Sequence, residues 1–223
     1  MYKAIFLIGP PGSGKGTQAE LLAKELVFFH FEISRIIEKK FKEAGPDDKE
    51  FIHQKEHWIR GELIHPEIVS KWFFEEVELL KDRVGGFVFS GSARTIEETK
   101  QNLNYLSGIY GAENIAAIEI KLSEAESIKR NSARRICEKN RHPIPNFPEL
   151  ADLKTCPEDG SPIITRELDK PEIIKERYQV YLRDTAPVID YFKESGYKVF
   201  EINGEQPIEK VFQDIKERIY DFD

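Results

Sequence analysis

The stretch that decides the fold lies near the N-terminus and reads Gly9-Pro10-Pro11-Gly12-Ser13-Gly14-Lys15. It follows the apolar run 4–8, Ala-Ile-Phe-Leu-Ile, which is typical of a strand buried on both faces of a parallel sheet. After the stretch, apolar residues recur at helical spacing between Thr17 and Leu26. A strand, a glycine-rich loop with the pattern G-x4-G-K and a helix, in this order, predict a phosphate-binding loop.

The chemistry of this loop follows from its residue types. Glycine lets the backbone curl until successive N–H groups point inward at one anion. The N-terminus of the following helix adds positive potential, and the Lys15 ammonium reaches the terminal phosphates of a nucleotide. The alternative is a glycine-rich turn that binds nothing. It does not explain why strand, loop, lysine and helix stand in register.

Four further segments have the pattern of strands, namely residues 27–31, 86–89, 116–122 and 197–202. Helical patterns lie at residues 17–26, 33–41, 47–60, 67–81, 95–106, 123–135, from about 171 onward, and 207–220. Ser123 and Glu126 form a capping box at the start of one of these helices. Five strands that alternate with helices predict an α/β fold with a five-stranded parallel sheet.

Composition and charge exclude several classes of function. The chain has 223 residues and a formal net charge of −7, so it lacks the positive excess that a nonspecific nucleic-acid-binding protein needs. Its two cysteines are too few for a disulfide framework and suggest a reducing compartment. The apolar run 4–8 is too short for a signal peptide or a membrane span. We therefore expect a cytoplasmic protein without nucleic-acid or membrane partners.

Residues 9–19, which extend beyond the lysine, closely resemble the loop of the adenylate kinases, a family of nucleoside monophosphate kinases. The resemblance continues over nearly the whole chain, at residues 61–69, 91–96, 130–135, 166, 177, 181–187 and 202–204. It implies a three-layer P-loop NTPase fold with a core of residues 1–32, 66–136 and 166–223. A helical insert at 33–65 would bind the nucleoside monophosphate, and a lid at 137–165 would close over the nucleotide. The resemblance also implies a monomer.

The same resemblance implies the reaction and the residues that carry it. The expected activity is reversible transfer of the γ-phosphate of ATP, bound with Mg2+, to a nucleoside monophosphate. The ATP-binding residues would be Pro11, Gly12, Ser13, Gly14, Lys15, Gly16, Thr17, Arg130, Arg134 and Gln206. The residues that align the two anions and stabilise the transferred group would be Lys15, Arg94, Arg130, Arg134, Arg166 and Arg177.

Residues 129–141 carry six basic side chains and one glutamate, which makes a local positive region in an acidic chain. A spacing of four predicts that Arg130 and Arg134 share one helix face, where guanidinium groups can bind phosphate oxygens in pairs. From the residues alone, a solvated basic helix end explains the pattern equally well. The family resemblance favours phosphate binding for these two arginines and leaves Arg135 and Arg141 to solvent.

The acceptor side is where the chain departs from the family pattern. By resemblance the nucleoside monophosphate would contact Ile33, Glu38, Glu62, Leu63, Ile64, Gly91, Arg94, Glu98, Arg166 and Arg177. Ile33 stands in place of a threonine, and Glu38 in place of an arginine that binds the acceptor phosphate. Ser90 stands in place of the aspartate that orients the waters of the magnesium ion, and Ser92-Ala93 in place of Phe-Pro.

Glu98 stands in place of the glutamine that reads adenine, and it bears on the choice of acceptor. An ionised carboxylate only accepts hydrogen bonds, which suits the donor edge of guanine better than adenine. GMP or another monophosphate is therefore an alternative to AMP, whereas a Glu98 side chain that only faces water is the plainer interpretation. Because Ser90 and Glu38 also depart from the pattern, an ATP-binding sensor or scaffold with weak or no transfer is the competing function.

Two cysteines flank the proline-rich segment 143–162, at positions where some members of the family bind zinc. Cys137, Cys156 and Asp159 are competent ligands, and Asn140 or His142 would supply the fourth. One expectation is a structural Zn2+ in the lid. The other is a lid held by hydrogen bonds and packing without metal.

Overall fold

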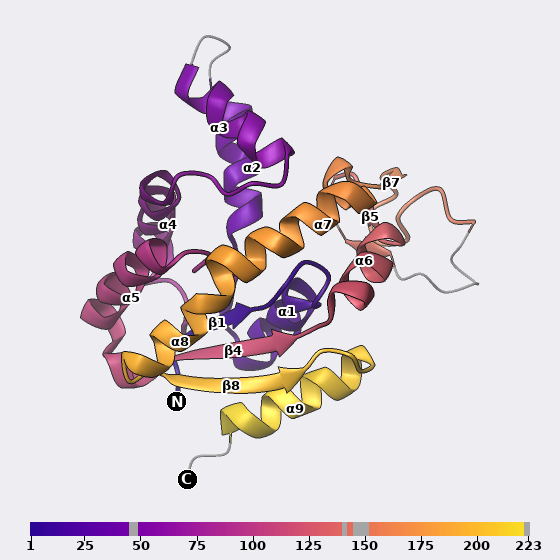
Figure 1. Ribbon diagram of the computed structural model, residues 1–223. Coiled ribbons are helices and arrows are strands. Elements are labelled where there is room, and N and C mark those ends of the chain that lie inside the picture. Colours follow the sequence, from indigo (N-terminus) through magenta and orange to yellow (C-terminus); the bar gives the residue numbers. More distant parts are fainter. Residues whose placement is uncertain (45–48, 140–141, 145–151, 221–223) are drawn as a thin grey trace.

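The computed structural model describes residues 1–44, 49–139, 142–144 and 152–220 (Figure 1). Its centre is a five-stranded sheet in the order β2-β3-β1-β4-β8, and all four neighbouring pairs are parallel. The strands are β1 (Ala4–Ile8), β2 (Phe29–Glu32), β3 (Phe87–Ser90), β4 (Ile115–Lys121) and β8 (Lys198–Asn203). The predicted five-stranded parallel sheet is confirmed.

β1 is the central strand of the sheet. Its side chains are apolar toward both faces along its whole length, which suits a position between two layers of helices. All five of its residues are at most 2% exposed, and it pairs with β3 on one side and β4 on the other. Since the strands run parallel, their carboxyl ends meet at one edge of the sheet. Ligands of open α/β sheets bind at that edge, which is where the glycine-rich loop leaves β1.

Helices cover both faces of the sheet, which gives the predicted three layers (Figure 1). One face packs against α1 and α9 through an aliphatic core that includes Leu22 and Ile215. The other face packs against α4, α5 and α8 through an aromatic core, in which the rings of Phe6 and Phe89 stack with centroids 4.7 Å apart. The helices run over α1 (Lys15–Leu26), α4 (Pro66–Leu80), α5 (Ile96–Tyr110), α8 (Ala186–Glu194) and α9 (Ile208–Tyr220).

Two segments project from this core (Figure 1). α2 (Ile33–Glu43) and α3 (Lys49–Ile59) follow β2 and fall within the predicted acceptor insert. A small antiparallel sheet in the order β6-β5-β7 falls at the predicted lid and consists of β5 (Arg135–Cys137), β6 (Pro143–Ile144) and β7 (Ile163–Ile164). In the described part of the chain, no helix is long and apolar enough to cross a membrane.

Helix α6 (Glu124–Ser132) is shorter than the predicted 123–135. The Arg134 N–H donates to the Asn131 carbonyl and closes the helix, and Arg135 already belongs to β5. The prediction that Arg130 and Arg134 share a helix face is therefore wrong. The physical reason is non-local, because pairing of β5 with β6 and β7 draws the chain out of the helix.

Two other boundaries differ from the predicted ones. β2 begins at Phe29, because Val27 ends α1 in the left-handed region, with φ 57°, and is 82% exposed. The helix after Pro171 is interrupted: α7 (Pro171–Val180) passes through a π-helical turn at Tyr181–Thr185 into α8. Proline near the start of α8 lacks an N–H for the regular helical ladder, which accounts for an irregular turn at this point.

Candidate active site

Residues 9–15 join β1 to α1 and form the predicted phosphate-binding loop. Gly12 and Gly14 have left-handed φ values of 77° and 85°, which glycine adopts without a steric penalty. The Ser127 hydroxyl, from α6, donates to the Pro11 carbonyl at 2.7 Å and braces the loop from outside. The first turn of α1 thus opens at the carboxyl edge of the sheet, where its N–H groups favour an anion.

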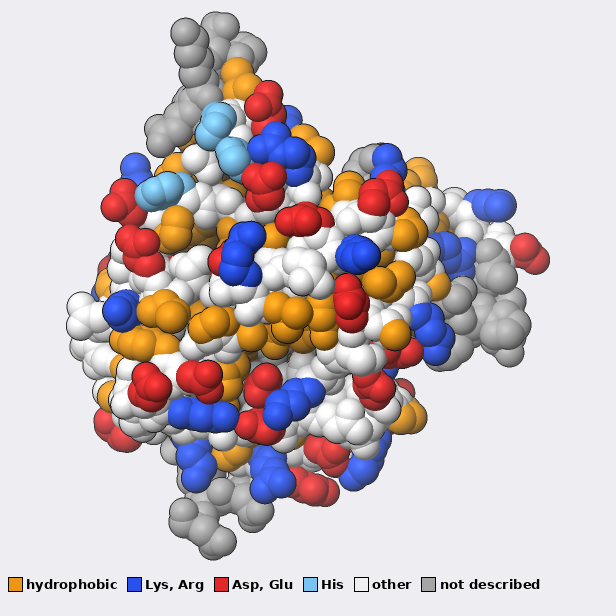
Figure 2. Space-filling view, viewed as in Figure 1, with side chains coloured by type: hydrophobic (Ala, Val, Ile, Leu, Met, Phe, Trp, Pro, Cys, Tyr) orange, Lys and Arg blue, Asp and Glu red, His pale blue; other side chains and the backbone are white. Residues whose placement is uncertain are grey.

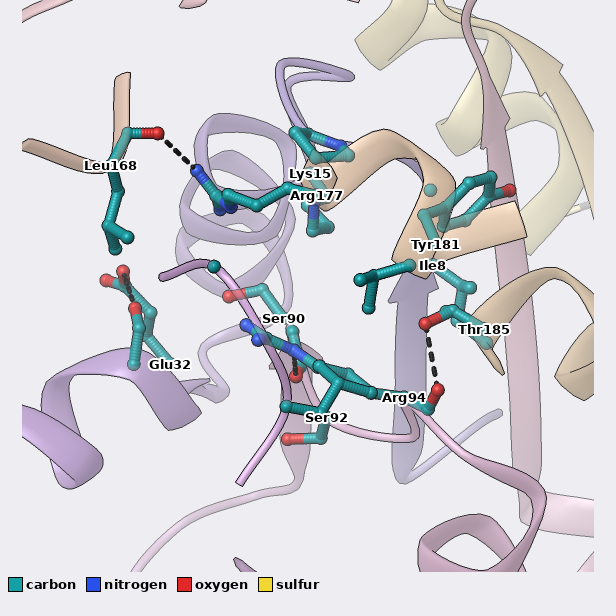
Figure 3. Close-up of a pocket in the computed structure, with 18 of the residues that line it drawn as sticks. Ile8, Lys15, Glu32, Ser90, Ser92, Arg94, Leu168, Arg177, Tyr181 and Thr185 are labelled. Atoms are coloured by element: carbon teal, nitrogen blue, oxygen red, sulfur yellow. Dashed lines mark hydrogen bonds between the residues drawn. The ribbon is translucent and has the colours of Figure 1, made fainter. Parts of the chain in front are cut away.

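One cavity of about 180 Å³ beside this loop is lined by Lys15, by the three arginines Arg94, Arg134 and Arg177, and by Arg166, which pairs with Glu38. Figure 3 shows Lys15, Arg94 and Arg177 reaching into it from α1, the loop after β3 and α7. Burial, followed by the charges of the three arginines, lowers the pKa of Lys15 to about 7. Burial and the neighbouring arginines lower the pKa of Arg177 to about 9. A polyanion in the cavity would relieve this repulsion.

Asp169 is the buried counter-charge of the cluster, at 6% exposure. It accepts two hydrogen bonds from the Arg134 guanidinium, and its nearer oxygen lies 3.8 Å from Arg177 Nη1. Arg177 Nη1 also donates to the Leu168 carbonyl at 3.1 Å (Figure 3). Five basic side chains line the cavity against two carboxylates, Glu32 and Glu62, so the contacts of Asp169 orient the arginines while the lining stays net positive.

Most of the predicted site residues meet at this edge of the sheet. Those that line the main cavity are Pro11, Lys15, Gly16, Glu62, Leu63, Gly91, Arg94, Arg134, Arg166 and Arg177. A smaller adjoining pocket is lined by Ile33, Ile64 and Glu98 together with Leu63, Gly91 and Arg94. Gly12, Ser13, Gly14 and Thr17 form the loop and the first turn of α1 without lining either pocket. The smaller pocket thus adjoins the main cavity and shares Leu63, Gly91 and Arg94 with it.

Two residues that were predicted to bind ATP, Arg130 and Gln206, line neither the main cavity nor the smaller pocket. Arg130 donates to Glu126, four residues earlier on α6, at 2.8 Å. The Gln206 amide donates to the Asn203 carbonyl at 2.8 Å and to Asp214 at 2.9 Å. Neither residue lines the cavities, so their contact with ATP stays a prediction.

Glu38, which stands where the family pattern has an arginine, has a partner in the protein. Its Oε1 lies 3.5 Å from Nη2 of Arg166, which follows β7. The ion pair therefore joins α2, in the acceptor insert, to the end of the lid segment. Both partners are mostly buried, with side chains 28% and 17% exposed, so this pair is screened less than a surface pair.

Glu98 does not face water, and its carboxylate holds the loop that carries Arg94. It is 3% exposed, and its two oxygens accept hydrogen bonds from the backbone N–H groups of Ala93 at 2.9 Å and Arg94 at 3.1 Å. Ala93 adopts a left-handed φ of 61°. The proline of the family pattern has no N–H and fixes φ near about −65°, so it could form neither feature. Ala93 and Glu98, which both differ from the family pattern, thus belong to one hydrogen-bonded structure at the start of α5.

Three residues that the sequence did not single out also shape the site. Asp169 carries no motif, and nothing in its spacing from the arginines marks it. The Thr185 hydroxyl, in the π-helical turn, donates to the Arg94 carbonyl at 2.8 Å (Figure 3). Glu32 lines the main cavity. A polar residue at the end of a predicted strand was the available signal, but the strand predicted at 27–31 stopped one residue before it.

The segment predicted to be a lid brings together four side chains with ligand atoms within 4.8 Å of one another: Cys137, His142, Cys156 and Asp159. Both cysteines are buried, and His142 Nδ1 lies 3.4 Å from Cys156 Sγ. Cys137 Sγ donates to Asp159 at 3.4 Å. Asn140 lies outside the described residues. Two thiols, an imidazole and a carboxylate at this spacing fit a tetrahedral zinc site.

This geometry defines a P-loop protein that handles phosphates, with one cavity at the loop and a second pocket beside it. The model of the family described as "Adenylate kinase" matches residues 7–197. The chain is 33% identical over 222 residues to "Adenylate kinase" of Petrotoga mobilis, covering 95% of this chain and 94% of that one. "Adenylate kinase" of Methanocella arvoryzae is 32% identical over 222 residues, 96% of each chain. The chain belongs to the adenylate kinase family, and it is a phosphotransferase.

The lowered pKa of Lys15 predicts that ATP binding takes up a proton. At pH 8 the amine is mostly neutral in the free protein, and bound phosphates raise its pKa so that it becomes charged. Affinity for ATP should therefore fall as the pH rises above about 7. Calorimetry of Mg·ATP binding at pH 8, in buffers with different ionisation enthalpies, measures the uptake. The K24Q variant, which changes an exposed lysine of α1, should keep the proton uptake, whereas K15R should abolish it. Zero uptake by the unaltered chain would contradict the prediction.

The contacts of Glu98 predict that E98Q weakens the protein. The amide can accept from one N–H but presents a donor to the other, which costs about 1–3 kcal/mol of unfolding free energy for a buried group. Arg94 also loses its position, so phosphate transfer slows at least about tenfold. Urea unfolding and initial rates measure the two effects. E97Q removes the same charge from an exposed position one residue away and changes stability by less than about 0.5 kcal/mol. Equal effects of the two variants would refute the role of Glu98.

Proposed function

We propose that this protein transfers the γ-phosphoryl group of ATP reversibly to a nucleoside monophosphate, with AMP as the acceptor. The observation that carries the proposal is the convergence of Lys15, Arg94, Arg134 and Arg177 on a cavity beside the phosphate loop. Two anionic substrates must approach each other during this reaction, and their mutual repulsion is the main obstacle. A cluster of cations held in place before binding offsets it without further reorganisation.

In this mechanism the side chains position and neutralise phosphates, and none acts as a covalent nucleophile. Lys15 and Arg134, beside the loop, take the ATP phosphates, while Arg94, Arg166 and Arg177 take the acceptor phosphate. Planar guanidinium groups suit this work because each can bind two oxygens at once. Closure of the lid segment excludes water, which directs the phosphoryl group to the acceptor instead of to hydrolysis.

Members of this family use Mg2+ with ATP, and the donor set of the main cavity fits that ion. Mg2+ prefers oxygen ligands and keeps several waters, bound through phosphates and one or two carboxylates. The cavity contains the Glu32 carboxylate and the Ser90 hydroxyl near Lys15 and Gly16. The ion supplies further positive charge to the phosphates when it is bound.

Two arguments bear on the acceptor base. The relatives named adenylate kinase favour AMP. Glu98 lines the smaller pocket, which keeps GMP as the alternative, although both of its oxygens already accept backbone N–H groups. A sensor without transfer is the competing function. The departures at Ser90 and Glu38 motivate it.

An acceptor panel tests this proposal. ADP formation from Mg·ATP is followed with AMP, GMP, CMP, UMP and their deoxy forms, and ATP binding is measured in parallel. We expect AMP to give the fastest ADP formation. GMP as the best acceptor would favour the reading of guanine by Glu98. ATP binding without acceptor-dependent ADP, for every monophosphate, would establish the sensor and overturn the proposed transfer.

R94K provides the matched control for contaminating activity. It keeps the charge but loses the planar fork, so acceptor-dependent turnover should fall about a hundredfold, or about 2.7 kcal/mol in barrier. R183K makes the same exchange at an exposed arginine paired with Asp184 and should leave turnover unchanged. If R94K and R183K behave alike, the measured activity does not come from this cavity.

We also propose that the lid cluster binds one structural Zn2+, with His142 as the fourth ligand. The folding energy of such a site depends on the metal, so a chelator should lower the melting temperature. H142Q should lose the bound zinc and the response to the chelator, whereas N140A should keep both. Metal content by atomic emission and thermal unfolding measure these effects. Zinc that is lost in N140A and retained in H142Q would assign the fourth position to Asn140. A chain purified with zinc in the medium that holds none would refute the site.

A further inference from the structure

The end of β2 places a carboxylate beside the position where the family pattern has its magnesium-orienting aspartate. β2 and β3 are parallel neighbours, and Glu32 stands directly opposite Ser90 in their register. Residues two apart on a strand share a face, so His30 and Glu32 point to the same side. That side is the one Ser90 occupies, because His30 Nε2 lies 2.8 Å from Ser90 Oγ. Glu32 and Ser90 therefore face the same layer, which contains α1.

Glu32 belongs to the main cavity, not to the outer surface. Its side chain is 23% exposed and lines the cavity together with Lys15 and Ser90 (Figure 3). Its negative charge acts on the loop, since it raises the pKa of both Lys15 and Arg94 against the effect of burial. The carboxylate is thus within electrostatic reach of the groups that surround the phosphates.

Two contacts fix the orientation of this carboxylate. Oε1 accepts from the Ser34 hydroxyl and Oε2 from Arg35 Nε, both at 2.7 Å. Both donors stand in the first turn of α2, so these bonds hold the carboxylate in a defined orientation. Among the described residues that line the main cavity, the other acid is Glu62, which is held by His57 and Arg60.

We propose that Glu32 is the carboxylate through which this chain engages the magnesium ion of Mg·ATP, in place of the aspartate that Ser90 replaces. In this chain the carboxylate stands at the end of β2 instead of at the end of β3. Ser90 instead forms a hydrogen bond with His30. The inference rests on the proposed function for the presence of ATP in the cavity.

The test compares the affinity for ATP with and without Mg2+, in the absence of any acceptor. Calorimetry on the whole chain gives the dissociation constant of ATP without Mg2+ divided by the dissociation constant with Mg2+. This ratio is the Mg2+ preference. For E32Q we expect this ratio to fall at least tenfold, with metal-free ATP bound as tightly as by the unaltered chain or more tightly, since a negative charge is removed. A role that is only structural would weaken both forms of ATP equally. That result, or an unchanged ratio, would overturn the proposal.

Two further variants complete the design. E20Q removes a carboxylate from an exposed position of α1 near His30 and should leave the ratio unchanged. E32Q/S90D returns an acid to the end of β3 and should restore at least half of the lost Mg2+ preference; failure to restore any would count against the proposal. Electron paramagnetic resonance of Mn2+ in the complex with ATP reports the same change independently. Because no acceptor is present, a chain that binds Mg·ATP but transfers nothing still tests Glu32.

Discussion

Like charges held close together are the constraint on which the rest of this structure depends. Four separate parts of the chain supply Lys15, Arg94, Arg134 and Arg177. The mutual repulsion of these side chains destabilises the folded protein when no anion is bound. A rigid three-layer core, with five parallel strands ending at one edge, is what allows them to be kept together. Buried Asp169 and the Leu168 carbonyl orient Arg134 and Arg177, and the basic side chains that line the cavity still outnumber its carboxylates.

The fold could be predicted where its determinants are local. Apolar patterns located all five strands of the main sheet: an unbroken apolar run marks β1, which is buried on both faces, whereas apolar and polar residues alternate in the edge strand β8. The end of α6 could not be predicted, because Arg135 leaves the helix to pair in a small sheet whose other strands come later in the chain. Val27 was misplaced for a similar reason: a β-branched residue favours a strand, but here it ends a helix in the left-handed region.

In the site, sequence similarity located the phosphate loop and four of the arginines that line the cavity. The departures from the family pattern could not be interpreted one by one, because their partners are other residues of this chain. Glu38 as an isolated change predicts repulsion of phosphate, yet it pairs with Arg166. Glu98 as an isolated change predicts a different base, yet it binds the N–H groups of Ala93 and Arg94. The pairing of Glu38 with Arg166 depends on proximity between segments far apart in the sequence, and that of Glu98 depends on the left-handed backbone at Ala93.

The left-handed backbone at Ala93 constrains how this chain could have diverged from its relatives. A proline restored there alone would clash with the local backbone and remove an N–H from Glu98, and a glutamine restored at 98 alone would present a donor to an N–H. Each single reversal therefore passes through a poorer loop than either end state. Residues 93–98 therefore depend on one another for their conformation. A chimaera between this protein and a relative should exchange the segment whole.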